Sequence, residues 1–306
     1  MSVANGFYKF NEWIDLPYNE QPWLIKPLIP AGGWVNLYGQ PKKARKSYLA
    51  TGMSWAVSSG QDQWLGFDVP TSGPVAYFQV DTPHTIWRQR NLDISKGGYD
   101  LSNIWFASMS TIPYPFNITE HADTLNEMIN DIPEKPVMII YDTGRKMHQL
   151  DENSSQDMTM VMGLLEEVAG IGMAKVLVTH SKKGGGEGDQ DAPDETDGGD
   201  LMKNNRGSSA VAGAVDTVIE MTPKGYMKYQ GRAVGEGHKK LKFTHVFGEM
   251  GFMWEEDVSP ETAEARKLLT LYKLGSERSL ARILAKRFDM DEEKARAIIR
   301  KQKEHK

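Results

Sequence analysis

Cysteine is missing from this chain of 306 residues. Its absence excludes disulfide bonds, thiolate metal sites and cysteine nucleophiles, and it agrees with a reducing compartment such as the cytoplasm. No apolar run approaches the ~18 residues that a membrane-spanning helix needs, and the first residues lack the basic segment and apolar run of a secretory signal. We therefore expect a soluble, cytoplasmic protein with no membrane partner.

An excess of positive charge is also missing. The chain has 36 Lys and Arg residues against 41 Asp and Glu residues, a net charge of -5, so any nucleic-acid contact must be concentrated in patches. Residues 184–200 hold six glycines and seven acidic residues but no lysine or arginine. Because such a segment cannot bury enough apolar surface to offset its ordering entropy, we expect a mobile acidic loop there.

Short apolar runs alternate with helical stretches along the first part of the chain. Strands that are apolar on both faces and separated by helices indicate a parallel sheet covered on both sides, which is an α/β fold. Later strand-like runs, DTVIEMT among them, look antiparallel. The expected parallel strands are 35–39, 75–80, 104–108, 137–141 and 174–180, and the helices between them begin near Lys46, Thr85, Thr119 and Ser155.

The composition predicts three regions. Residues 1–33 are a lead-in segment, residues 34–257 form the core, and residues 259–306 form a small helical module with a net charge of +5. This module resembles a helix–turn–helix, and its exposed cations would then meet DNA phosphates. The alternative is a small packing or partner-binding domain. The cations concerned are Arg282, Lys286, Arg287, Arg296, Arg300 and Lys301.

The segment YGQPKKARKSYLA lies between a buried strand and a helix, where a phosphate-binding loop belongs. Such a loop needs inward-pointing backbone N–H groups, a lysine for the phosphates and a hydroxyl for Mg²⁺, and Lys46 and Ser47 supply the last two. Six residues rather than five separate Gly39 from Lys46, and Arg45 replaces the usual second glycine. The alternative is a basic turn before an amphipathic helix. The candidate nucleotide-binding residues are Gly39, Pro41, Lys42, Lys43, Ala44, Arg45, Lys46, Ser47 and Tyr48.

Three polar residues follow apolar strands. Asp142 ends the run VMIIYD, as a carboxylate that orients Mg²⁺-bound water does, so Ser47 and Asp142 are the candidate metal residues. Asp81 follows VAYFQV and could polarise an attacking water, whereas His180 follows AKVLVT and could sense the γ-phosphate. The alternative roles are a helix N-cap for Asp81 and a structural histidine for His180.

With these segments assembled, the chain resembles the RecA-like ATPase family that includes RepA-type hexameric replicative helicases of plasmids, phages and mobile elements. The resemblance spans roughly residues 22–245 and implies a RecA-like core. Its segments keep an order and spacing similar to the family's, and DENSSQDM and RGSSAVAGAVD are the most distinctive. The others are PWLIKPLIPAGGWVNLYGQPKKARKS, GPVAYFQVDTP, IIYDTGRKMHQL, VLVTHSKKG and GRAVGEGHKKLKF.

The resemblance implies an ATPase that uses Mg²⁺, forms a homo-oligomeric ring, with a hexamer as the expected form, and acts on single-stranded DNA. In it, Lys46 and Ser47 bind nucleotide and Mg²⁺, Asp142 is the metal-site acid, and His180 occupies the sensor position. Arg232 falls where the family presents an arginine finger to the neighbouring subunit. The acidic loop falls where such proteins place a DNA-facing loop, with contact expected from Lys182, Lys183, Lys203 and Arg206.

Two departures from the family pattern bear on catalysis. Arg45 replaces a glycine, and Asp81 stands where the family usually has the longer glutamate, so we expect slow hydrolysis. The leading prediction is a DNA-dependent, ring-forming ATPase of the helicase type. The alternatives are a RecA-like recombinase or DNA-binding mediator that uses ATP as an assembly switch in filaments, and a nucleotide-binding regulator without motor activity.

Overall fold

A computed structural model of the chain describes residues 9–14, 22–181, 201, 209–246, 251–271 and 276–304. The chain divides into two compact units, Met1–Glu255 and Glu256–Lys306. The predicted acidic loop and the candidate DNA-binding residues Lys182, Lys183, Lys203 and Arg206 lie outside the described residues. No helix in the described part of the chain is long and apolar enough to cross a membrane.

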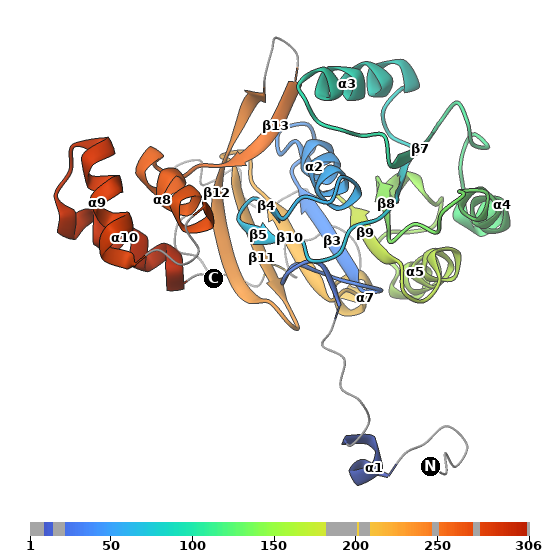
Figure 1. The fold of residues 1–306 in the computed structure, drawn as a ribbon. Coiled ribbons are helices and arrows are strands. Elements are labelled where there is room, and N and C mark those ends of the chain that lie inside the picture. The colour runs from blue at the N-terminus through green and yellow to red at the C-terminus, as the bar shows by residue number, and fades with distance from the viewer. Residues whose placement is uncertain are drawn as a thin grey trace, which may run out of the picture. The chain divides into compact units, whose positions relative to one another are not determined.

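The first unit is built on a nine-stranded sheet (Figure 1). Its strand order is β13-β12-β11-β10-β3-β9-β8-β6-β7, and all neighbours from β10 to β7 run parallel. β11 is antiparallel to both β10 and β12. The strands are β3 (Trp34–Gly39), β6 (Val75–Gln79), β7 (Ile104–Ser108), β8 (Met138–Asp142), β9 (Ala174–Val178), β10 (Thr217–Met221), β11 (Tyr226–Gly231), β12 (Gly235–Val246) and β13 (Gly251–Glu256).

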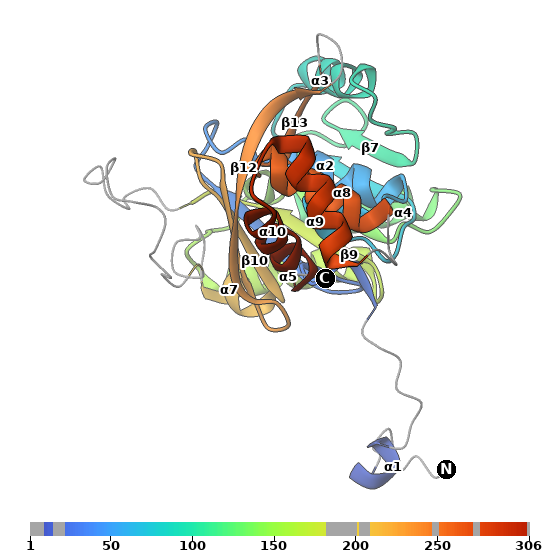
Figure 2. The ribbon, with the colours of Figure 1, turned by 60° about the vertical axis from the view of Figure 1, so that its left-hand side comes forward.

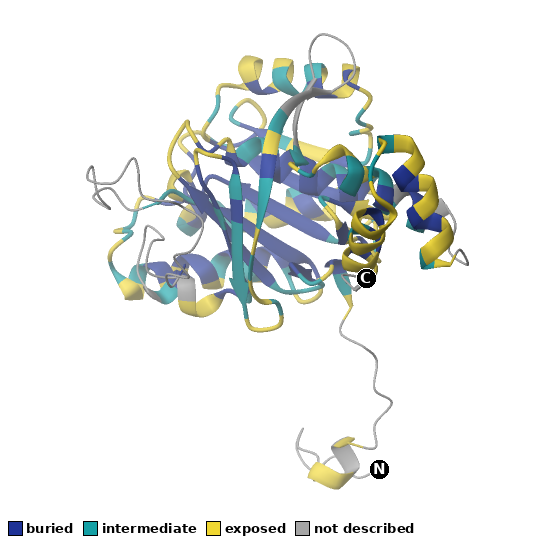
Figure 3. Ribbon diagram, turned by 90° about the vertical axis from the view of Figure 1, so that its left-hand side faces the viewer, coloured by how far each residue is buried: buried dark blue, intermediate teal, exposed yellow. Residues whose placement is uncertain are grey.

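Helices cover both faces of the parallel strands (Figure 1). Val35 and Leu37 of β3 pack in the apolar cluster that contains α2 (Lys46–Ser58), whereas Trp34 and Tyr38 pack in the cluster that contains α4 and α5. Successive strand residues point to opposite faces, so an all-apolar strand needs helices on both sides. Figure 3 shows the buried strands between partly exposed helices. The remaining helices are α3 (His84–Lys96), α4 (Ile118–Asn130), α5 (Ser155–Ala169) and α7 (Ser209–Ala214).

This architecture confirms the predicted α/β fold with a mainly parallel sheet. The segment DTVIEMT contains β10 and was predicted to be antiparallel to its neighbours. This prediction was right for β11 but wrong for β3, with which β10 pairs in parallel. An apolar strand carries no local signal of its direction, since either ladder buries the same side chains. The register places Met221 opposite Gly39, the last residue of β3 and the first glycine of the predicted phosphate loop.

Several short elements were not predicted. α1 (Phe10–Ile14) is a single short helix, and β1 (Trp23–Ile25) pairs with β2 (Ile29–Pro30). A second small ladder joins β4 (Gln63–Trp64) to β5 (Phe67–Asp68), and the 3₁₀ helix η1 (Gly144–Lys146) follows β8. Leu24, Ile25, Leu28 and Ile29 are all buried in the cluster that also contains α2. The expected lead-in segment therefore contributes side chains to the core.

The second unit contains the helices α8 (Pro260–Leu271), α9 (Glu277–Phe288) and α10 (Glu292–Glu304), drawn in red in Figure 2. Ala281 and Leu284 of α9 and Ala295 and Ile299 of α10 lie in one buried apolar cluster. Five arginines of this unit form ion pairs within it. The pairs are Arg266 with Glu256, Arg287 with Glu264, Arg282 with Glu292, and both Arg296 and Arg300 with Glu277.

Candidate nucleotide-binding site

The loop between β3 and α2 starts at a glycine that the packing requires. A Cβ atom on Gly39 would lie 2.3 Å from the carbonyl oxygen of Met221 and 2.9 Å from the Cβ of Ala44. Both distances are shorter than real Cβ atoms show, and the nearer atom belongs to the backbone of β10. The first glycine of the predicted phosphate loop is therefore needed for close approach of the loop to the neighbouring strand.

Arg45 adopts the backbone conformation that glycine usually supplies at this point. Its φ of 49° and ψ of 38° are left-handed, and its side chain does not cap α2. The guanidinium lies 4.2 Å from the ring centroid of Phe243 on β12, a cation–π contact worth ~0.5–2 kcal/mol. This contact offsets part of the ~1–2 kcal/mol that a left-handed residue with a side chain costs. The loop makes this left-handed turn without the second glycine, and the backbone N–H groups at the start of α2 can receive an anion.

Lys46 is folded back onto the loop that carries it. Its side chain is buried, and Nζ lies 3.0 Å from the carbonyl oxygen of Gly39, 3.4 Å from that of Gln40 and 3.2 Å from Nδ1 of His180. Burial lowers the pKa of Lys46 to about 8, against the opposing charges of Asp142 and Asp81. The structure thus brings together the lysine and the histidine that the sequence had named separately.

The carboxylate of Asp142 is almost completely buried, with 1% of the residue exposed. Oδ2 accepts a hydrogen bond of 2.9 Å from the phenol of Tyr77, whereas Oδ1 has no hydrogen-bond partner among the described residues. Burial raises the pKa of Asp142. Ser47, Tyr77 and Lys46 favour the ionised form, although the Ser47 hydroxyl does not complete a hydrogen bond of normal geometry to Oδ1. A buried carboxylate oxygen without a partner is costly unless a ligand satisfies it.

These groups fit Mg²⁺ bound together with phosphates. Mg²⁺ usually takes one or two carboxylates, a hydroxyl, waters and phosphate oxygens rather than a cage of protein ligands. In keeping with this, the described residues contain no cluster of three or more His, Cys, Asp or Glu side chains that could hold a metal alone. Ser47 and Asp142 are the residues that would hold the ion, where it would neutralise phosphate charge.

Asp81 follows β6 at the same edge of the sheet. Its side chain is exposed, and its charge acts on both Lys46 and Asp142. The turn that carries Asp81 is held by the buried Gln79, whose Oε1 accepts the backbone N–H of Thr82 at 3.1 Å. The structure therefore gathers Lys46, Asp81 and Asp142 at the carboxyl ends of β3, β6 and β8.

Arg232 lies elsewhere. It follows β11 at the end of the sheet where β3 begins, opposite to the phosphate loop. Its guanidinium forms an ion pair with Asp216 at 3.4 Å and donates to the carbonyl of Gly213 at 2.9 Å. Arg232 does not reach the phosphate loop of its own chain.

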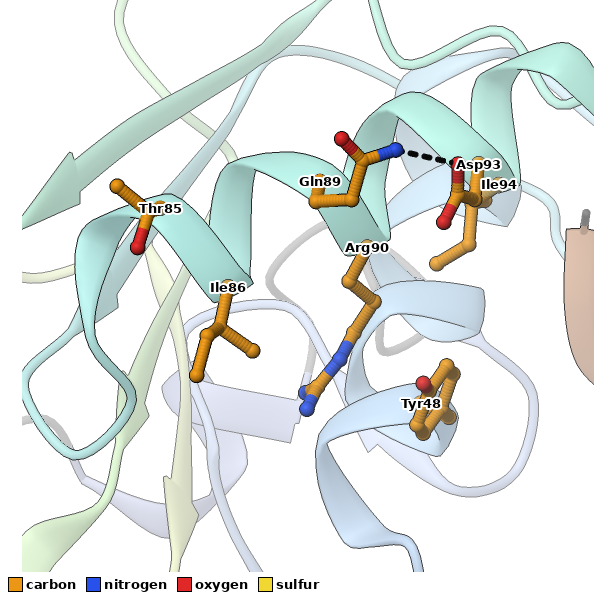
Figure 4. A pocket seen from close by; sticks show the side chains of 7 residues that line it. All are labelled: Tyr48, Thr85, Ile86, Gln89, Arg90, Asp93 and Ile94. Carbon is orange, nitrogen blue, oxygen red and sulfur yellow. Dashed lines mark hydrogen bonds between the residues drawn. The ribbon is translucent and has the colours of Figure 1, made fainter.

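A pocket of about 420 Å³ lies between α2 and α3, beside the start of α2 (Figure 4). The guanidinium of Arg90 lies 4.6 Å from the ring centroid of Tyr48, the residue that follows Ser47. The sequence analysis named Tyr48 but missed Arg90, because an arginine on an amphipathic helix has no feature that distinguishes it from a solvated one. The pocket is lined by Tyr48, Thr85, Ile86, Gln89, Arg90, Asp93 and Ile94.

Comparisons with known proteins concern the family and the fold of this chain. The family model described as an AAA domain matches residues 9–186, more than half of the chain. A DnaB-like replicative helicase, solved in a study of its interactions with primase, superposes with a TM-score of 0.52 at 11% identity over 73% of this chain and 59% of the other. This similarity confirms the RecA-like core and concerns the fold alone. This chain spans less than two thirds of the helicase.

A KaiC-like protein of the archaeon Pyrococcus horikoshii OT3 gives a TM-score of 0.46 at 13% identity, over 76% of this chain and 93% of the other. No curated protein sequence matches the chain.

Proposed function

The chain belongs to the AAA domain family of P-loop ATPases, and from this premise we propose that it hydrolyses ATP with Mg²⁺ as a DNA-stimulated motor of the replicative helicase type. The observation that carries the proposal is the convergence of Lys46, Ser47, Asp81, Asp142 and His180 on one edge of the sheet. In open α/β sheets, ligands bind at the carboxyl ends of the strands.

The start of α2 and Lys46 would bind the phosphates, and Ser47 and Asp142 would hold Mg²⁺. Asp81, which is exposed beside Asp142, would orient the attacking water. His180 would sense the γ-phosphate, because it contacts the same ammonium group of Lys46 that the phosphate would bind. Nucleotide binding would therefore draw Lys46 away from His180 and from the carbonyl of Gly39.

The pocket beside Tyr48 suits the base of the nucleotide. It adjoins the start of α2, and it offers a guanidinium and an aromatic ring as flat surfaces, from Arg90 and Tyr48. Gln89 and Asp93, joined by a 2.7 Å hydrogen bond, add polar groups at its wall (Figure 4). Planar bases stack well on such surfaces.

The position of Arg232 supports action between subunits. An arginine finger stabilises charge on a transferring phosphate, and Arg232 lies at the opposite end of the sheet from its own phosphate loop. It would therefore serve a neighbouring subunit in a ring and would first have to leave Asp216. Single-stranded DNA would contact Lys182, Lys183, Lys203 and Arg206.

A second candidate function is a recombinase or mediator that uses ATP as an assembly switch. Asp81 favours it, because its carboxylate is one methylene shorter than that of glutamate and would reach a water less readily. Slow hydrolysis suits a switch better than a motor.

The first experiment measures ATP hydrolysis with and without single-stranded DNA in the wild type, in Lys46→Ala and in Lys135→Ala. Lys135 is an exposed lysine before β8 and serves as the matched control. DNA-stimulated hydrolysis that disappears only in Lys46→Ala supports the motor. ATP binding without hydrolysis would contradict it and favour the regulator.

A second experiment separates the helicase from the recombinase. Purified protein is offered a forked duplex with ATP, and negative-stain images are taken with ATP and single-stranded DNA. Strand displacement by rings supports the helicase. Filaments that never displace a strand would support the recombinase or mediator.

A further inference from the structure

Tyr77 is a buried tyrosine that contacts the candidate metal residue directly. It lies on β6, and 1% of it is exposed. β6 and β8 pair so that Gln79 lies beside Asp142, and Tyr77 precedes Gln79 by two residues. Because strand side chains alternate, Tyr77 and Asp142 project from the same face of the sheet, the face covered by α2.

The hydrogen bond from Tyr77 makes the two oxygens of Asp142 unequal. The phenol donates to Oδ2 at 2.9 Å, which leaves Oδ1 as the oxygen without a partner among the described residues. Ser47, the other candidate metal residue, also acts on this carboxylate. A carboxylate that is held by one oxygen presents the other in a fixed direction.

Tyr77 is itself held by its surroundings. Its ring lies 5.0 Å from that of Trp87 on α3 and 5.7 Å from that of Phe106 on β7. Aromatic packing on two sides thus fixes the ring whose hydroxyl holds Oδ2 of Asp142.

We propose that Tyr77 is a positioning residue for the metal site. It holds Oδ2 of Asp142 and leaves Oδ1 to act with Ser47 toward Mg²⁺. The inference rests on the proposed function, since it requires that the chain bind nucleotide with Mg²⁺. It assigns a role to a residue that touches neither nucleotide nor reacting atoms and that would otherwise be read as part of the apolar core.

The test uses Tyr77→Phe, which keeps the ring and removes the hydroxyl. We measure binding of a fluorescent ATP analogue to the full chain at increasing Mg²⁺ concentration, and also in EDTA. The Mg²⁺ concentration that gives half of the metal-dependent gain in affinity should rise ~10-fold, as for other partners of metal ligands. Affinity in EDTA should stay unchanged, because the phosphate loop is intact.

Tyr141→Phe is the matched control. Tyr141 precedes Asp142 on β8, is fully buried, and donates a 3.0 Å hydrogen bond to the carbonyl of Leu165 on the other face of the sheet. Both substitutions remove one buried phenol hydrogen bond, so a purely structural role would give the same result in both. Only Tyr77→Phe should shift the Mg²⁺ dependence.

An unchanged Mg²⁺ dependence in Tyr77→Phe would overturn the inference and leave the proposed function standing. Nucleotide binding by the wild type that ignores Mg²⁺ would overturn both. If Tyr77→Phe does not fold, 4-fluorophenylalanine incorporated at position 77 takes its place, because the fluorine fills the space of the hydroxyl but cannot donate the hydrogen bond to Asp142. This variant should raise the half-saturating Mg²⁺ concentration in the same direction, and no change there would also overturn the inference.

Discussion

The two compact units of this protein treat their charged groups in opposite ways. At the sheet edge of the first unit, Lys46 and Asp142 are both buried, and Asp142 keeps an oxygen without a partner in the described part of the chain. In the second unit, arginines such as Arg296 and Arg300 lie exposed in ion pairs with glutamates. The first arrangement is incomplete without a ligand, whereas the arginines of the second already have glutamate partners within their own unit.

The difference indicates where ligand chemistry belongs. Exposed ion pairs contribute little to stability, so their presence in the helical unit does not by itself imply a function. Buried charges with unmet hydrogen bonds are costly, and they persist where a site requires them. Two results would contradict this difference between the units. One is a helical unit whose charged residues control ATP hydrolysis, and the other is a sheet edge whose charged residues do not affect it.

The largest effect is expected from Asp142→Asn. The amide keeps the size of the side chain but removes the charge that would hold Mg²⁺, so kcat for ATP hydrolysis should fall by a factor on the order of 10²–10³. Steady-state kinetics at saturating Mg²⁺ measure it. Asp123→Asn, on the exposed face of α4, is the matched control. Equal activity in both variants would place the metal acid elsewhere.

A smaller effect is expected from pH. Because burial lowers the pKa of Lys46 to about 8, the ammonium loses its proton as the pH rises through that value. Affinity for ATP should then fall, and its Kd should rise by up to ~10-fold for each pH unit above the pKa of Lys46. Binding titrations between pH 7 and 9.5 measure this. Lys46→Arg, which stays charged, should give a flat profile over the range, and a sloping profile in that variant would assign the effect to another group.

Arg45 offers a subtler comparison, within the phosphate loop itself. Both Arg45→Gly and Arg45→Ala lose the contact with Phe243, but only alanine keeps the left-handed strain. The glycine variant should therefore be more stable than the alanine variant by ~1 kcal/mol. Urea unfolding of the two variants measures the difference. A more stable alanine variant would show that the loop changes its backbone when the guanidinium is lost.

The smallest effect on nucleotide chemistry is expected from the helical unit. Replacing Arg296 and Arg300 by glutamine removes both partners of Glu277. The melting temperature should fall slightly, and ATP hydrolysis without DNA should equal that of the wild type. Parallel thermal and kinetic assays check this. A clear loss of hydrolysis would instead make the second unit part of the catalytic machinery.

Much of the core could be predicted from the sequence, because its strands are apolar on both faces and its helices follow in regular alternation. The polar residues at strand ends were also within reach. Asp81, Asp142 and His180 stand directly after apolar runs, and parallel strands bring such ends together. The direction of β10 relative to its neighbours could not be predicted from the sequence, because it depends on pairing with the distant strand β3.

The sequence analysis missed residues whose proposed roles depend on contacts with residues distant in the sequence. A tyrosine in the run VAYFQV has the pattern of a core residue, and only the pairing of β6 with β8 shows Tyr77 against Asp142. Arg90 becomes distinctive only when α3 is placed over Tyr48. The four proposed DNA-binding residues stay predictions, since they lie outside the described part of the chain.

The pairing of Gly39 with Met221 also has a consequence for how the protein is made. β3 lies between β9 and β10, and its partner in β10 follows it by 182 residues. Contacts between such distant segments form late in folding, and a chain emerging from the ribosome folds from its first residues onward. The phosphate loop therefore leaves the ribosome long before the strand that supports it. Nucleotide can bind a phosphate loop that has its full support only after β10 has been synthesised.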